Sequence, residues 1–172
     1  MKSTSPRSRV VLISTGGTIE KTYDELAGVL TNEVSVLEVM LSGLELHGVT
    51  IERVALMNKD SLDMSEEDHA LIATTALHKA RECDAVVIVH GTDRLAVTGE
   101  RIHEMNPNPP VPILLTGAMR PFAVRTTDAL QNLTESLLAA QLAPPGVYVS
   151  MHNKLLAFPG VHKDRERGTF RK

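Results

Sequence analysis

The 172-residue sequence contains one cysteine, no tryptophan and only 3% aromatic residues, and it has neither a large net charge nor a long apolar run. Cys83 has no partner in the chain for a disulfide, which favours a buried structural thiol and a reducing, cytoplasmic compartment. The shortage of aromatic side chains and the net charge of −3, counted with neutral histidines, argue against a nucleic-acid partner. The apolar runs are too short for a membrane span or a signal-peptide core, so no membrane partner is expected.

Metal and nucleotide sites also find little support. The seven histidines are scattered, and none stands at a metal-binding spacing from the cysteine or from carboxylates. The glycines form neither of the two phosphate-binding patterns, G-x-G-x-x-G and G-x-x-x-x-G-K-[ST]. We therefore expect no metal ion and no organic cofactor.

Apolar, β-branched runs alternate with segments of helical periodicity. This alternation predicts a single-domain α/β fold: a doubly wound, mostly parallel sheet with helices on both faces, flavodoxin- or Rossmann-like. The strands are expected at residues 9–14, 49–57, 84–90, 111–116 and 146–151, and the helices near 33–46, 66–82, 95–105 and 127–142. The domain should span residues 9–163, preceded by a flexible segment at 1–8 and followed by a charged, solvated tail at 164–172.

Two of the expected helices have recognisable starts. Ser65 is followed three residues later by Asp68, which is the spacing of a capping box. Thr127 and Asp128 offer side-chain acceptors for the free backbone N–H groups at the start of the last helix.

Two threonine–glycine motifs each follow a predicted buried strand. The first motif is Thr15-Gly16-Gly17-Thr18-Ile19, and the second motif is His90-Gly91-Thr92-Asp93. Because loops at the carboxyl ends of strands in an open α/β sheet line one crevice, two hydroxyls and a carboxylate are expected to converge there. A carboxylate beside a hydroxyl is suited to binding an ammonium group or orienting a proton acceptor.

Each of these motifs also has a purely structural interpretation. The first motif can be a glycine turn, and Asp93 can cap the next helix or form an Asx turn. Two further segments follow strands: the third motif, Gly117-Ala118-Met119-Arg120-Pro121, and the loop Asp60-Ser61-Leu62-Asp63-Met64. In that loop, turn formation is the simpler interpretation of Asp60 and Ser61.

Together, in this order and at this spacing, the four segments resemble the L-asparaginase family of bacterial type, which are amidohydrolases with threonine nucleophiles. The resemblance covers nearly the whole chain but only the N-terminal domain of that family. It implies that Thr18 is the nucleophile, that Tyr23 is the mobile-loop tyrosine that activates it, and that Thr92 is the second catalytic threonine.

The other roles are implied by the same resemblance. Lys163 is expected to pair with the catalytic residues Thr92 and Asp93. The α-carboxylate of the substrate would be held by Asp60 and Ser61, and its α-amino group by Asp93. The substrate-binding residues implied in this way are Gly17, Asp60, Ser61, Gly91, Thr92, Asp93 and Ala118.

The resemblance implies hydrolysis of L-asparagine to L-aspartate and ammonia through an acyl-enzyme on Thr18. L-Glutamine is an alternative substrate, because a methylene group is worth only about 1–3 kcal/mol in a pocket. We expect a homo-oligomer, either a dimer or a tetramer, since subunit packing would shield the pocket from water. The alternative from a different class is a non-catalytic amino-acid-binding module, or a truncated fragment of a two-domain amidohydrolase.

Overall fold

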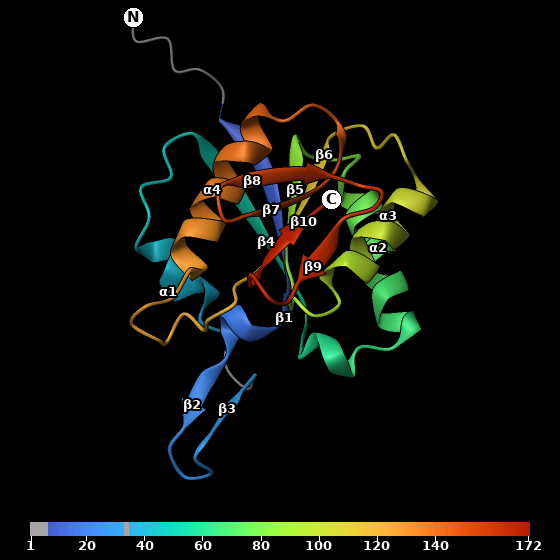
Figure 1. Cartoon of the computed structure of the whole chain (residues 1–172). Coiled ribbons are helices and arrows are strands. Elements are labelled where there is room, and N and C mark those ends of the chain that lie inside the picture. Colours follow the sequence, from blue (N-terminus) through green and yellow to red (C-terminus); the bar gives the residue numbers. More distant parts are fainter. Residues whose placement is uncertain (1–6, 33–34) are drawn as a thin grey trace, which may run out of the picture.

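A computed structural model describes residues 7–32 and 35–172. Its centre is a six-stranded sheet with the order β4-β1-β5-β6-β7-β8, which runs through the middle of Figure 1. Its strands are β1 (Ser8–Gly16), β4 (Val49–Lys59), β5 (Ala85–Val89), β6 (Pro112–Thr116), β7 (Gly146–Met151) and β8 (Lys154–Ala157). The first five are parallel, and β8 pairs antiparallel with β7. The mostly parallel sheet predicted from the sequence is therefore confirmed.

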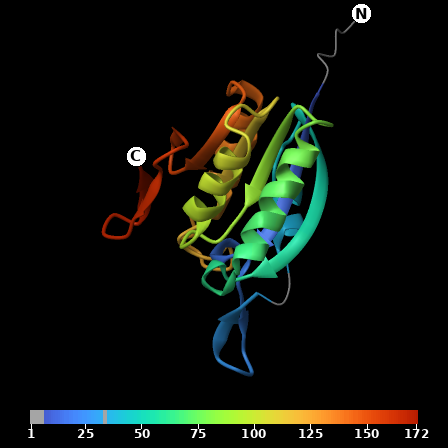
Figure 2. The same ribbon diagram turned by 90° about the vertical axis from the view of Figure 1, so that its right-hand side faces the viewer.

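Helices lie on both sides of this sheet in Figure 1, and Figure 2 looks onto one of the two helix-covered faces. They are α1 (Leu37–Ser42), α2 (Glu66–Lys79), α3 (Leu95–Met105) and α4 (Ala129–Leu142). Alternate residues of β1 feed two apolar clusters: Val11 and Ile13 pack with α2 and α3, whereas Val10 and Leu12 pack with α1 and α4. A strand that is covered on both faces has to be apolar on both, which explains the continuous apolar runs in the sequence.

The helix starts follow local side-chain chemistry, with one difference from the prediction. The capping box of α2 is present, with Ser65 Oγ accepting from the Asp68 N–H and the Asp68 carboxylate accepting from the Ser65 N–H. At α4, Thr127 Oγ1 accepts from the N–H of Ala129 at 3.0 Å. Asp128, however, makes no side-chain capping bond there, because its carboxylate turns to the third motif instead.

The helix expected at residues 33–46 is much shorter in the structure. α1 begins at Leu37 and ends at Ser42, where Gly43 follows as the C-cap. Residues 33–34 lie outside the described part of the chain. No helix within the described residues is long and apolar enough to cross a bilayer.

Two antiparallel hairpins were not expected from the sequence. One consists of β2 (Thr22–Asp24) and β3 (Val29–Thr31), and it projects from the body of the molecule in Figure 1. The other consists of β9 (His162–Asp164) and β10 (Thr169–Arg171). The prediction of a solvated tail at 164–172 is therefore wrong: Phe170 of β10 is only 1% exposed and packs into the core. Of the segment expected to be flexible at 1–8, residues 1–6 lie outside the described part, and Ser8 already belongs to β1.

Cys83 is a free, half-buried thiol between α2 and β5. Burial raises its pKa, and its Sγ donates to the carbonyl oxygens of Lys79 and Ala85. A thiol with a raised pKa is a poor nucleophile, so the structural interpretation of Cys83 stands.

Candidate active site

Most of the predicted site residues gather at the carboxyl edge of the sheet, around the junction of β1 and β5. Along the chain the parallel strands follow the order β1, β4, β5, β6 and β7, but in space β4 lies on one side of β1 and β5 on the other. The connections therefore leave β1 and β5 in opposite directions. Open α/β sheets bind ligands at such a switch point, and here the first motif ends β1 while the second motif follows β5.

Two glycines let three loops approach one another closely at this junction. Gly17 has a φ of 84°, and a side chain there would collide with the backbone of Gly91. A Cβ atom at Gly91 would in turn lie 2.6 Å from the Oγ atom of Ser61. Only glycine permits these two contacts. They bring the neighbouring residues Thr18 and Thr92 into adjoining segments of the same edge.

Lys163 of β9 reaches the second motif from a distant part of the sequence. Its Nζ atom lies 2.8 Å from Thr92 Oγ1 and 3.0 Å from Asp93 Oδ1. Arg165 Nη1 contacts the same Asp93 oxygen at 2.8 Å. Burial on its own would raise the pKa of the Asp93 carboxyl, but the hydrogen bonds and charges of Lys163 and Arg165 hold that pKa below its usual value. Asp93 is therefore an anion near neutral pH and is paired with two cations.

Ser61 begins the short helix η2 (Ser61–Asp63), and Asp60 is its N-cap residue. The Asp60 carboxylate accepts from the Leu62 N–H at 3.0 Å, which is the turn role considered from the sequence, and it also accepts from Lys21 Nζ at 2.6 Å. The Lys21 hydrogen bond is the largest cause of a lowered pKa at Asp60. Ser61 is buried, and its Oγ accepts from the Arg94 N–H at 3.2 Å.

Thr18 and Tyr23 take little part in this contact network. Thr18 begins the short helix η1 (Thr18–Glu20) and is half-buried, and its hydroxyl forms no hydrogen bond within residues 7–32 and 35–172. Tyr23 stands in the projecting hairpin, where it pairs with Leu30 and is 64% exposed. No hydrogen bond joins the two side chains in the part of the chain that the structure describes. The activation of Thr18 by Tyr23 stays a prediction.

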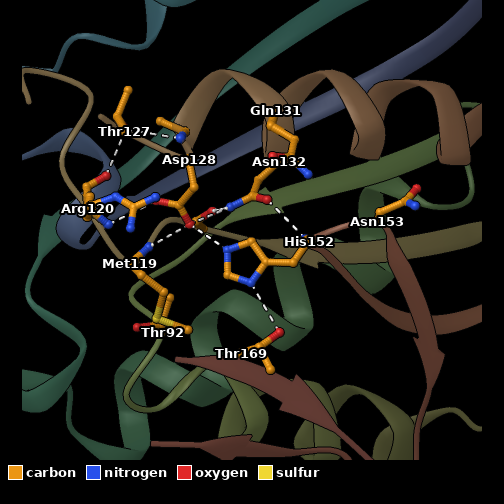
Figure 3. Close-up of polar contacts among 12 residues, drawn as sticks. Thr92, Met119, Arg120, Thr127, Asp128, Gln131, Asn132, His152, Asn153 and Thr169 are labelled. Atoms are coloured by element: carbon orange, nitrogen blue, oxygen red, sulfur yellow. Dashed lines mark hydrogen bonds and ion pairs between the residues drawn. The ribbon is translucent and has the colours of Figure 1, made fainter. Parts of the chain in front are cut away.

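The third motif is held in place by the Asp128 carboxylate (Figure 3). This group accepts from the backbone N–H groups of Met119 and Arg120, both at 3.0 Å, and from Asn132 Nδ2 at 3.0 Å. Ala118, expected to contact substrate, is fully buried, and its side chain belongs to the apolar cluster of the α1 and α4 face. Contact between Ala118 and a substrate therefore stays a prediction, because this residue exposes no surface in the structure.

A buried hydrogen-bonded chain behind the second motif escaped the sequence analysis. Thr98 Oγ1 lies 2.7 Å from both His69 Nδ1 and His90 Nε2, and His90 Nδ1 lies 2.8 Å from the Gly91 carbonyl oxygen. Burial lowers the pKa of His90 to about 4 and also lowers that of His69. Both rings are therefore neutral near pH 7. The only sequence signal was the position of His90 directly before Gly91.

Arg165 is a further residue at this edge that the sequence analysis missed. It lies in a segment interpreted as a solvated tail, and nothing in its local pattern indicated a contact with Asp93, more than seventy positions earlier in the chain. No group of three or more histidine, cysteine or acidic side chains suited to a metal ion occurs among the residues that the structure describes.

Comparison with known proteins finds similarity over nearly the whole chain. A family model described as "Asparaginase, N-terminal" matches residues 9–169. The chain is 32% identical over 164 residues to an L-asparaginase of Thermococcus kodakarensis, covering 93% of this chain and 49% of that protein. The solved structure of the thermostable L-asparaginase from the same organism superposes with a TM-score of 0.85 over 95% of this chain and 50% of that chain.

Two other similarities bear on function. The chain is 31% identical over 151 residues to one subunit of the glutamyl-tRNA(Gln) amidotransferase of Methanobrevibacter smithii, covering 87% of this chain and 34% of that protein. The structure of a probable cytoplasmic L-asparaginase from Campylobacter jejuni has a TM-score of 0.78 at 26% identity, covering 95% of this chain and 51% of that one. The chain thus spans about half the length of the asparaginases it matches and about a third of the amidotransferase subunit.

Proposed function

The chain belongs to the asparaginase family, and from this membership we propose that it is a threonine amidohydrolase that converts L-asparagine to L-aspartate and ammonia. One observation supports the proposal most directly. The Lys163 ammonium group joins Thr92 to Asp93 beside the Gly17–Gly91 contact that adjoins Thr18. A cation and a carboxylate thus accompany Thr92 at the edge where open α/β sheets bind ligands, and Thr18 follows the adjoining Gly17.

In the proposed reaction the Thr18 hydroxyl oxygen attacks the side-chain amide carbon of the substrate, and its proton is passed to the departing nitrogen. The amide C–N bond breaks, ammonia leaves, and the aspartyl group remains on Thr18 as an ester. Water then adds to the ester carbon, the ester C–O bond breaks, and Thr18 regains a proton as L-aspartate is released. A threonine hydroxyl is a weak nucleophile at neutral pH, so the surrounding groups have to stabilise the charges that develop.

Lys163 has a specific part in this proposal. Its ammonium group donates to the Thr92 oxygen, so the hydroxyl hydrogen of Thr92 is free to donate to the substrate. A donor of this kind, aimed at an oxyanion, is worth about 2.7–4 kcal/mol in a protease for which it has been measured. Asp93 would bind the α-ammonium group of the substrate, and Ser61 with Asp60 its α-carboxylate.

Ammonia release from L-asparagine by the purified chain, before and after Thr18→Ala, tests the proposal. We expect steady release by the parent and a loss of at least about a thousandfold in the variant, because no other group replaces a missing nucleophile. Thr74→Ala, which removes an exposed threonine of α2, is the matched control and should leave the rate unchanged. Thr18→Ala at the parent rate, with the fold intact by circular dichroism, would contradict the assignment.

A second candidate function is the release of ammonia from L-glutamine for use by a partner protein. It is favoured by the similarity to the amidotransferase subunit. The rates for asparagine and glutamine, measured side by side, separate the two candidates. Binding of L-aspartate without turnover of either amide would favour the non-catalytic amino-acid-binding module.

We also propose that the active species is a cytoplasmic homo-oligomer. The similarity to the probable cytoplasmic L-asparaginase of Campylobacter jejuni and the single cysteine support the compartment. In one chain the Asp60 and Asp93 side chains keep about a quarter of their surface exposed, and exclusion of water by a neighbouring copy would strengthen the electrostatics of the site. Sedimentation velocity at the assay concentration is the test, and a fully active monomer would contradict this proposal.

A further inference from the structure

Arg165 is the feature of this site that the proposed reaction does not use. It is the first residue after β9. Its side chain is 67% exposed, and its guanidinium group contacts Asp93. Lys163, only two residues earlier, contacts the same Oδ1 atom of Asp93. Strand β9 and the turn that follows it therefore direct two cations at one carboxylate oxygen.

The charges that contact one another at this edge do not balance. Lys21 pairs with Asp60 at 2.6 Å, and Lys163 and Arg165 pair with Asp93, so three cations meet two carboxylates. An arginine side chain is charged at every physiological pH. The surroundings of Asp93 therefore carry an excess of positive charge before any substrate arrives.

Asp93 is also the group that would bind the α-ammonium of asparagine in the proposed function, on which this inference rests. That ammonium would have to displace the guanidinium or lie beside it, and like charges a few ångströms apart repel each other. Asp93 Oδ2, which has no hydrogen-bond partner among residues 7–32 and 35–172, remains as an acceptor, but within the field of both cations.

We propose that Arg165 is a specificity-determining residue that disfavours a free α-ammonium group, and that it therefore lowers the preference of the site for asparagine over carboxylated amides without a cationic amine on the α-carbon. Succinamate, which is asparagine without its α-ammonium group, is the simplest member of this class. It keeps the amide and the carboxylate, so the chemistry at Thr18 is unchanged. Asparagine remains a substrate, but a poorer one than it would be without Arg165.

The test is the ratio of kcat/KM for asparagine to kcat/KM for succinamate in the parent and in Arg165→Ala. A unit charge close to a partly exposed site changes the affinity of that site for an ammonium group by about tenfold. We therefore expect Arg165→Ala to raise the ratio by about tenfold, mostly through a lower KM for asparagine. Arg165→Lys keeps the charge and should keep most of the parent's preference.

Arg167→Ala is the matched control. Arg167 lies in the same hairpin turn, is 71% exposed and pairs with Asp164 instead of Asp93. Its removal changes the net charge of the protein by the same amount, so its ratio should stay at the parent value. The inference would be overturned if Arg165→Ala left the ratio within about twofold of the parent value. It would also be overturned if Arg165→Ala and Arg167→Ala raised the ratio equally.

Binding without turnover keeps this inference separate from the proposed function. Calorimetric titration with L-aspartate and with succinate compares the same two carboxylates with and without the ammonium group. Arg165→Ala should bind L-aspartate about tenfold more tightly than the parent does, with little change for succinate. If no variant hydrolyses any amide, the proposed function fails, while the binding result still decides the role of Arg165: no gain in affinity for L-aspartate overturns it.

Discussion

The position of the second motif depends on three buried side chains that touch no substrate in the proposed reaction. The Gly91 carbonyl oxygen only accepts hydrogen bonds, so the nearby Nδ1 of His90 must carry a hydrogen. The neutral ring then has a bare Nε2, which accepts the hydroxyl hydrogen of Thr98. The oxygen of Thr98 in turn accepts from Nδ1–H of His69. Each tautomer is fixed by the one before it.

This arrangement matters because Gly91 is the residue on which the other loops pack. Gly17 and Ser61 both approach its backbone too closely for a side chain, and the carbonyl group of Gly91 is held from behind by His90. This series of hydrogen bonds ends at His69 Nε2, a buried nitrogen without a hydrogen-bond partner among the described residues. Its last lone pair is thus left unsatisfied, which costs stability, while the loop that carries Thr92 is held in place.

At the scale of elements, the β9–β10 hairpin positions the Lys163 side chain. Figure 3 shows how this hairpin is tied to the main sheet: His152, in the turn between β7 and β8, lies 2.7 Å from Asp128 Oδ2 and 3.1 Å from Thr169 Oγ1. The carboxylate of Asp128 accepts, so Nε2–H of His152 donates to it. Phe170 adds the apolar contact, because its ring is buried in the core beneath the hairpin.

Phe170→Ala should loosen this hairpin and lower activity together with stability. Loss of a buried phenylalanine costs about 3–5 kcal/mol. Backbone amides of residues 162–171 should then exchange hydrogen faster than those of α2, and ammonia release should fall because Lys163 no longer stays near Thr92. Hydrogen exchange followed by mass spectrometry and the denaturation midpoint are the measurements.

Two other variants control this experiment. Leu142→Ala removes an exposed apolar side chain from α4 and should change stability by less than about 0.5 kcal/mol. Phe170→Leu keeps most of the apolar volume and should give an intermediate effect on both readouts. Unchanged exchange of the hairpin amides in a folded Phe170→Ala protein would show that the ring does not hold this element.

The elements that the sequence predicts and those that it misses differ in length and burial. The strand at Ala85–Val89 is apolar throughout because it is fully buried, and the helix at Glu66–Lys79 has both periodicity and a capping box, so both were identified. The strands of the two hairpins are only three residues long. At that length no alternation is visible, and a single buried residue such as Phe170 decides whether a charged segment is a tail or a hairpin.

For the molecule as a whole, the sequence predicts the layers and the edge at which the site lies. Both follow from the alternation of strands and helices, because the switch point of a doubly wound sheet collects the ends of distant strands. The sequence could not predict the contacts that cross the fold. Arg165, His152 and Asp128 bond to residues far away in the chain, and no local pattern records such pairs.

Buried histidines make the stability of the whole domain depend on pH. In the unfolded chain a histidine has a pKa near 6.5, whereas His90 has one of about 4 in the fold and His69 is shifted in the same direction. The unfolded state therefore binds more protons as the pH falls from about 6.5 to 4, and His90 should lower the free energy of unfolding by up to about 1.4 kcal/mol per pH unit in this range. His69 acts in the same direction. Lowered carboxyl pKa values, as at Asp93 and Asp128, act at lower pH, below about 4.

Urea unfolding at pH 7.5, 6.0 and 5.0 measures this slope. His90→Gln should make it shallower, whereas His78→Gln, at an exposed position of α2, should leave it unchanged. Glu20, whose pKa is raised chiefly by burial, opposes the histidines in part of this range, so the comparison of variants isolates the contribution of His90. Thr98→Val keeps both rings but removes the hydroxyl between them, and it should cost about 1–3 kcal/mol at pH 7.5 because buried nitrogens lose their partner. Equal slopes in His90→Gln and the parent would mean that His90 takes up its proton as easily in the fold as in the unfolded chain.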